Sequence, residues 1–152
     1  MANEAVIINL GYGQGDVQRY TVASGAAFEK GSTCYLTDPR TIFQTFDTTR
    51  GGGNSLSGAF AGIAAEEKVA AEGNTSLGLW TSGIFDLKLA TGATIHAGEL
   101  VTFSGANTID KFGSGAGGIN FVAALSSGAF LGRALETGTS NEVIAVKLGS
   151  FL

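Results

Sequence analysis

A ten-residue segment occurs twice in the chain, and this repeat limits the possible folds more than any other feature. Residues 57–66 read SGAFAGIAAE and residues 127–136 read SGAFLGRALE, with seven of the ten positions identical. In each half an apolar-x-x-Gly motif (FEKG at 28–31, IHAG at 95–98) precedes a hairpin pattern, a glycine-rich loop, the repeat and an alternating segment. We therefore predict that one structural unit is present twice. The alternative is a chance match in a chain that contains 24 glycines.

Two hairpins are predicted, one before each copy of the repeat. The first turns at Asp38-Pro39, between apolar runs at 34–36 and 42–46. Asp and Pro suit the first two positions of a type I turn. The second hairpin lies in the segment GELVTFSGANTIDKF and turns at 104–107.

Two further segments, 84–89 and 143–148, carry apolar residues at every second position. Such alternation is typical of a strand with one buried face. The predicted buried faces consist of Phe85, Leu87 and Leu89 in the first segment and of Ile144, Val146 and Leu148 in the second. Residues 64–72 contain good helix formers, so we expect at most a short helix there, with Gly73 suited to its end.

Together these patterns predict an all-β fold: a small barrel or sandwich built from two similar halves, with an extended N-terminal arm and at most a short helix. Closing or covering sheet edges protects a β protein from uncontrolled pairing. We expect residues 1–16 to form the arm and a glycine hinge, and residues 17–152 to form a single β domain. The similar halves are placed at about 25–89 and 92–152.

The repeated G-A-F-x-G-x-A pattern is interpreted as a strand that enters the core. Phe60 and Phe130 would be buried anchors, each contributing about 1.5–3 kcal/mol if fully desolvated. The neighbouring glycines and alanines would allow another backbone or ring to come close. The alternative is a loop that inserts a phenylalanine.

Composition excludes several classes of function. The chain has 152 residues, a formal net charge of −4 and only 14% charged residues. No basic patch indicates nucleic-acid or anionic-membrane binding, and no apolar run approaches the roughly 20 residues of a membrane helix. The start of the chain lacks the basic region of a secretory signal. A surface with so little charge suggests extensive contact with other proteins.

Candidate catalytic and ligand-binding residues are few. His96 is the sole histidine, and no nucleophile motif accompanies it, so we expect a loop histidine. Glu66 and Glu67 are adjacent but belong to no calcium-loop pattern. The segment GYGQGD departs from a dinucleotide fingerprint, and GGGN lacks the lysine of a phosphate loop. We therefore predict no catalytic residues, metal, cofactor or small-molecule substrate, and no enzymatic activity.

Two other side chains have alternative interpretations. Cys34 is expected to be a small buried hydrophobic residue, because a single cysteine forms no internal disulfide. Trp80, in the segment LGLW, fits a core or subunit-interface position better than a sugar-stacking platform. The sugar-stacking interpretation gives the alternative function, a carbohydrate- or receptor-binding β module of a phage tail or cell surface.

The segments VASGAAFEKGSTCYL, GAFAGIAAE and FLGRALETGTSNEVIAVKL resemble the head-decoration, or capsid cement, proteins of tailed bacteriophages. Those proteins end in a Gly-x-Ala-Leu-Glu segment, a polar turn and an alternating strand. Here the corresponding residues are Gly132, Ala134, Leu135 and Glu136, followed by 143–148. The likeness extends from about residue 22 to residue 148, although EEKVAAEGNTSLGLW makes the first half longer than in shorter members of the family.

The resemblance implies a structural virion protein that is made in the host cytoplasm and binds the outer capsid surface. It implies a homotrimer that stabilises contacts between major capsid subunits, with no nucleic-acid or membrane partner. The apolar arm before the glycine hinge suits strand addition to a partner's sheet edge. The candidate capsid-binding residues of this arm are Asn3, Ala5, Val6, Ile7, Ile8 and Leu10.

Overall fold

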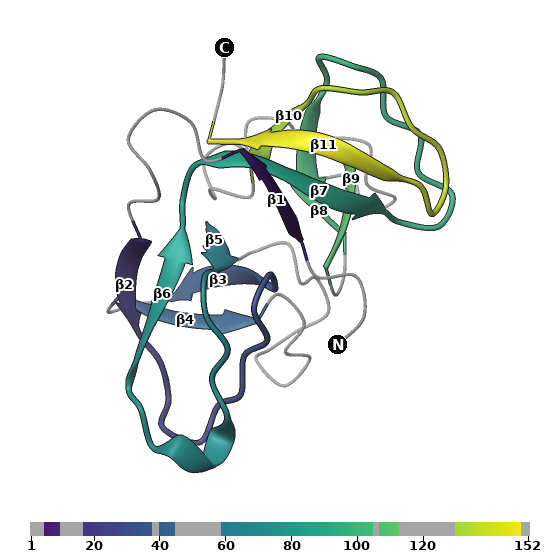
Figure 1. Cartoon of the computed structure of the whole chain (residues 1–152). Coiled ribbons are helices and arrows are strands. Elements are labelled where there is room, and N and C mark those ends of the chain that lie inside the picture. Colours follow the sequence, from purple (N-terminus) through teal and green to yellow (C-terminus); the bar gives the residue numbers. More distant parts are fainter. Residues whose placement is uncertain are drawn as a thin grey trace.

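The computed structural model describes residues 5–9, 17–37, 40–44, 59–104, 107–112 and 130–149. These residues form eleven strands and one turn of 3-10 helix, which confirms the predicted all-β fold with at most a short helix (Figure 1). The helical turn, η1 (Ala70–Glu72), ends at Gly73, whose φ of 67° lies in the left-handed region. The predicted end of the helix is therefore correct.

Five strands of the first half form a closed barrel in the order β2-β4-β3-β5-β6. Their bounds are β2 (Val17–Thr21), β3 (Thr33–Thr37), β4 (Thr41–Gln44), β5 (Ala59–Ala64) and β6 (Ser76–Trp80). Neighbouring strands are antiparallel except β2 and β4, whose parallel pairing at Thr21 and Thr41 closes the barrel.

A second sheet repeats this arrangement with β7 (Gly83–Leu89), β8 (Leu100–Phe103), β9 (Thr108–Lys111), β10 (Phe130–Ala134) and β11 (Val143–Leu148). Its strands run in the order β7-β11-β10-β8-β9, and a parallel pairing of β7 with β9 closes it. Strand β1 (Val6–Asn9) adds to β7 outside this closed set (Figure 1). The strands of both predicted hairpins pair as β3–β4 and β8–β9, whereas residues 38–39 and 105–106 of the predicted turns lie outside the described residues.

The two barrels have the same connectivity, with β2 to β6 corresponding in order to β7 to β11. The structure therefore supports one unit present twice, and each unit closes a barrel of its own. The predicted boundary between the halves was wrong, because strand Gly83–Leu89 opens the second barrel and does not end the first. The last strand of the first barrel is β6, in which four of five residues are buried, so it lacks the alternation that identified its counterpart β11.

Matching β2–β6 with β7–β11 also gives the difference in length between the two halves. Equivalent bridges join Phe28 to Lys68 and Ile95 to Gly138 at the base of each barrel. From Lys68 to Gly78 is ten residues, whereas from Gly138 to the equivalent Ala145 is seven. The first half is thus longer by three residues after the repeat.

Each copy of the repeat forms the fourth strand of its barrel and contains a register irregularity next to a glycine. On β5 the irregularity lies opposite Cys34 and Tyr35 of β3. On β10 it lies between Phe130 and Gly132. A Cβ atom on Gly62 would lie 2.6 Å from the Trp80 carbonyl oxygen, and one on Gly132 would clash with the equivalent carbonyl of Lys147. The prediction that these glycines admit a neighbouring backbone is confirmed.

The glutamate that ends each copy also has the same partner in both barrels. A Glu66 carboxylate oxygen accepts the backbone N–H of Gly78 at 3.0 Å. A Glu136 oxygen accepts the N–H of the equivalent Ala145 at 3.3 Å. The repeated sequence therefore encodes a strand, its irregularity and a side-chain bond to the next strand.

Each barrel has an apolar core, and the second core extends to residues of the first barrel. The first core is formed by Val22, Phe28, Cys34, Ile42, Ala64, Leu77 and Leu79. On β7, Phe85, Leu87 and Leu89 are fully buried, and on β11 Ile144, Val146 and Leu148 are buried, as predicted. Ile63 and Trp80 face away from the first core and pack into the second.

The two repeated phenylalanines occupy equivalent strand positions but different surroundings. Phe130 is buried and packs edge-on against Phe112 at 6.0 Å between ring centroids. Phe60 is only partly buried, and its ring lies 6.5 Å from that of Phe103 in the other barrel. The prediction of a buried anchor therefore holds for Phe130, whereas Phe60 contributes to the contact between the barrels.

Candidate functional site

The N-terminal strand connects the two barrels. Val6 pairs with Asp86 and Ile7 with Phe85, so β1 extends the second sheet along β7. Immediately before this strand, the Ala5 N–H donates a hydrogen bond of 2.7 Å to the Gly31 carbonyl oxygen of the first barrel. The segment predicted to be a strand-forming arm is therefore paired within its own chain.

The predicted arm residues differ in their exposure. Ala5 is buried in the second core, whereas the side chain of Val6 is 61% exposed. Ile7 and Ile8 lie within β1, and Asn3 and Leu10 lie outside the described residues. Of the residues whose side chains are described, Val6 is thus the arm position that a partner could contact directly. The capsid-binding role of the arm stays a prediction.

A buried polar contact joins the barrels beside their aromatic contacts. The Asn107 side-chain oxygen accepts the Thr33 N–H at 3.0 Å, and the Thr33 hydroxyl lies 3.3 Å from the same oxygen. The Trp80 ring packs on Phe85 with centroids 5.8 Å apart, and the Lys30 ammonium group lies 5.8 Å from the Trp80 ring centroid. Sequence reasoning missed Asn107, because nothing local marks a turn residue that bonds 74 positions away.

Three residues weighed as candidates from the sequence have structural positions. Trp80 is only 9% exposed and packs between the barrels, so it offers no sugar-stacking platform. His96 lies in an exposed turn between β7 and β8, as expected. Cys34 is fully buried in the first core, as expected, and burial raises the pKa of its thiol to about 12. A thiol with this pKa is not a nucleophile at neutral pH.

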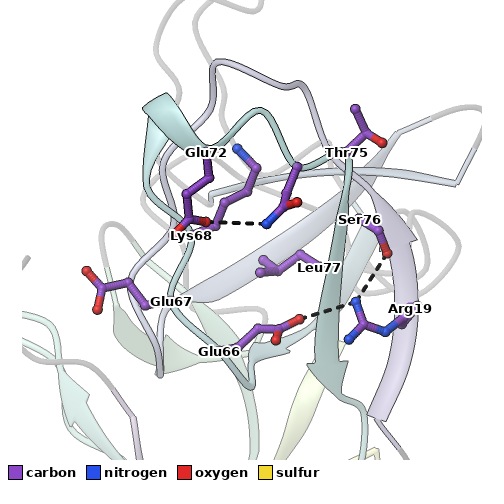
Figure 2. Close-up of a pocket in the computed structure, with 9 residues that line it drawn as sticks. Arg19, Glu66, Glu67, Lys68, Glu72, Thr75, Ser76 and Leu77 are labelled. Carbon is purple, nitrogen blue, oxygen red and sulfur yellow. Dashed lines mark hydrogen bonds and ion pairs between the residues drawn. The ribbon is translucent and has the colours of Figure 1, made fainter.

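A polar pocket lies on the first barrel between β2, β6 and the loop that carries η1 (Figure 2). Nine residues line it: Arg19, Glu66, Glu67, Lys68, Glu72, Asn74, Thr75, Ser76 and Leu77. Sequence reasoning did not single out this pocket, because its residues come together only when β2 pairs with β6.

The charges of the pocket stabilise the barrel that forms it. The Arg19 guanidinium lies 3.4 Å from Glu66 and from the Ser76 hydroxyl, which links β2 to β6 and to the segment that follows β5 (Figure 2). The buried Lys68 ammonium group donates to the carbonyl oxygens of Ser24 and Ala26 at 2.9 and 2.6 Å. Because the second barrel repeats the backbone bond of Glu66, this carboxylate has a structural role.

Comparison with known sequences adds no family. No protein-family model matches the chain, and no curated protein matches it. Within the described residues, no three histidine, cysteine, aspartate or glutamate side chains gather in a way that could hold a metal ion. The described part of the chain also contains no helix with the length and apolar character needed to cross a membrane.

Proposed function

We propose that the chain is a non-enzymatic structural virion protein that binds the outer surface of a phage capsid and stabilises contacts between major capsid subunits. The observation that carries this proposal is the pair of matching closed barrels, whose outer surfaces are available for protein contacts. The resemblance of the two repeat segments and of the last strand to head-decoration proteins supplies the biological setting.

The use of the polar side chains supports a structural role. Glu66 and Glu136 bond the backbone of the next strand, and Lys68 bonds two carbonyl groups of a loop. Glu99 bonds the His96 N–H and the Lys111 ammonium group. These groups hold strands and turns together, which is the use expected in a protein whose function is mechanical.

The surface composition supports extensive protein contact. Only 14% of the residues are charged. Large apolar side chains remain exposed at Val6, Val17, Leu36, Val69, Leu135 and Val143. A protein that binds the assembled shell and not its free subunits stabilises the shell by mass action. The homotrimeric state implied by the resemblance is part of the proposal, and a native mass measurement of the purified protein tests it.

The direct test is co-sedimentation with assembled shells. The purified chain is mixed with shells of the major capsid protein encoded in the same phage genome, and separately with unassembled capsid subunits. We expect the chain to pellet with the shells and to raise the temperature at which they dissociate. A chain that stays in the supernatant at saturating shell concentration would contradict the proposal.

The contribution of the N-terminal strand is tested by substituting its exposed residue. Val6→Lys places a charge on a side chain that is 61% exposed and pairs with Asp86, so β1 is expected to stay paired with β7 while shell binding weakens. Val69→Lys is the matched control, because Val69 is 49% exposed and lies beside η1 on the first barrel. Equal binding by both variants would exclude the arm from the capsid interface.

A further inference from the structure

Strand β2 of the first barrel and strand β7 of the second are equivalent residue by residue. The N–H of Val22 donates to the Thr75 carbonyl, and the N–H of Leu89 donates to the equivalent Glu142 carbonyl. Thr21 and Lys88 then both pair with the third strand of their barrels, β4 and β9. Counting back along each strand, Arg19 corresponds to Asp86.

The two strands differ in what lies along their outer edge. In β7, Asp86 and the residues before it pair with β1 (Figure 1). In β2, the Thr21 N–H bonds the Arg40 carbonyl, so the backbone groups of Arg19 and Val17 point to the same side by strand alternation. No strand among the described residues pairs with that side of β2 at residues 17–19. Within the described residues, the first barrel thus has an unpaired strand edge where the second has β1.

The number of available strands favours an extended segment of a different protein as the occupant of this edge. Among the described residues, the chain supplies one N-terminal strand, and this strand is held by β7 and by the bond from Ala5 to Gly31. Counted over the described residues, two equivalent edges and one such strand per chain leave one edge open in an assembly of identical copies. Exchange of the N-terminal strands between copies would leave the same number of edges unpaired.

The charge around the open edge specifies the partner further. Arg19 lies on the edge of β2, where its side chain pairs with Glu66 but is still 63% exposed, and the exposed Arg40 immediately precedes β4. The equivalent positions of the second barrel are Asp86 and Asn107, which carry no positive charge. Opposite charges on paired strands are favourable and like charges are unfavourable. A carboxylate opposite Arg19 therefore fits this edge, whereas a lysine does not.

We propose that residues 17–19 of β2 bind an extended, acidic and β-branched segment of another protein by strand addition, in the register that β1 adopts on β7. This inference depends on the internal repeat and holds whether or not the partner is a capsid subunit. Strand addition obtains affinity from main-chain hydrogen bonds and specificity from the side chains that alternate along the segment.

The test uses two synthetic peptides based on residues 3–10, NEAVIINL. One replaces the valine that pairs with Asp86 by glutamate (NEAEIINL), and the other replaces it by lysine (NEAKIINL). Each is titrated into the full-length protein while amide NMR signals are recorded. We expect saturable shifts at Val17 and Arg19, with affinity about five-fold higher for the glutamate peptide. Shifts confined to Ile84 and Asp86 would show displacement of β1 and would overturn the proposal.

Two variants at Arg19 separate the backbone and charge contributions. Arg19→Pro removes the outward N–H but no bond to β6, because the opposite residue Gly78 bonds Glu66 and Ala65 instead. This variant should abolish peptide binding. Arg19→Ala keeps the N–H and should bind both peptides equally.

Amide hydrogen exchange of the unmodified protein provides a measurement that requires no variant. The Val17 and Arg19 amides should exchange fast in the free protein and at least ten-fold more slowly with saturating glutamate peptide. Protection of both amides in the free protein to the level of Asp86 would show that the edge is already covered, and would overturn the proposal. Absence of any shift or protection at millimolar peptide would do the same.

Discussion

The Asn107 side-chain oxygen in the second barrel accepts the backbone N–H of Thr33 in the first barrel at 3.0 Å, and both residues are buried. Asn107 also has a φ of 54°, in the left-handed region that asparagine tolerates better than most residues. Asn107→Ala should lower the free energy of unfolding by about 2–4 kcal/mol, because a buried donor loses its partner and alanine is strained at this φ. Urea denaturation measures the change.

A glycine at this position separates the two effects. Asn107→Gly removes the same hydrogen bonds but relieves the backbone strain, so its loss should be smaller than that of Asn107→Ala by about 1 kcal/mol. Equal stability of the alanine variant and the unmodified protein would show that the contact between Asn107 and Thr33 does not hold the barrels together.

The glycine of the repeat should tolerate no side chain. Gly132→Ala would drive a methyl group into the Lys147 carbonyl on the adjacent strand, which is backbone and unable to move aside. We expect a loss of about 3 kcal/mol or more in the free energy of unfolding. Gly25→Ala is the control, because no atom lies within 4 Å of the added Cβ, and its effect should stay within about 0.5 kcal/mol.

The sequence predicts those strands whose two faces differ. In β7 the buried residues recur at every second position, and in β11 the large apolar core residues Ile144, Val146 and Leu148 do, because one face of each strand packs on the core. Strand β6 buries Leu77 and Leu79 in the first core and Trp80 in the second, so it shows no alternation. Strand β2 was missed because its residues are mostly exposed, with only Tyr20 packed on the core. Because neither β2 nor β6 could be recognised from the sequence, the boundary between the two halves was predicted at the wrong position.

The pocket and the contacts between barrels could not be predicted, because they join residues that are far apart in the sequence. Arg19 meets Ser76 only after β2 pairs with β6, and Thr33 meets Asn107 only after both barrels form. By contrast, the glycine and glutamate of the repeat could be recognised, since the same local bonds form in each copy. Strand β2 could be located only by aligning 17–21 with 84–88, and this alignment requires knowing that the second copy of the unit begins at β7.

The carboxylate of Glu99 should make stability depend on pH in the acid range. The His96 backbone N–H and the Lys111 ammonium group hold the pKa of Glu99 below its ordinary value of 4.5. A lowered folded-state pKa stabilises the protein above the ordinary pKa, and this contribution is lost as the pH falls through the folded-state value. Glu99→Gln should therefore lower the thermal midpoint at about pH 7 and have less effect below about pH 4.

The exposed Glu67 provides a control for this measurement. Glu67→Gln removes the same charge from the chain without breaking a bond like that between Glu99 and Lys111, so its thermal midpoint should follow the unmodified protein at both pH values. A Glu99→Gln effect that is equally large below pH 4 would mean that packing, and not the ionised carboxylate, is responsible.

The Cys34 thiol should be unreactive in the folded protein, and it should lower the stability of the protein at high pH. Burial raises the pKa of this thiol from 9.0 to about 12, so in the folded state it is protonated at pH 8, where thiol reagents act through the thiolate. A disulfide reagent should label Cys34 only at the rate of unfolding, and denaturant should make the labelling fast.

Between about pH 9 and 12 the unfolded thiol loses its proton while the folded one keeps it, so ionisation favours unfolding and stability falls as the pH rises. Cys34→Ala has no such proton to lose, and its stability should fall less over this range. A fast reaction of the folded protein at pH 8 would contradict the buried position of the thiol.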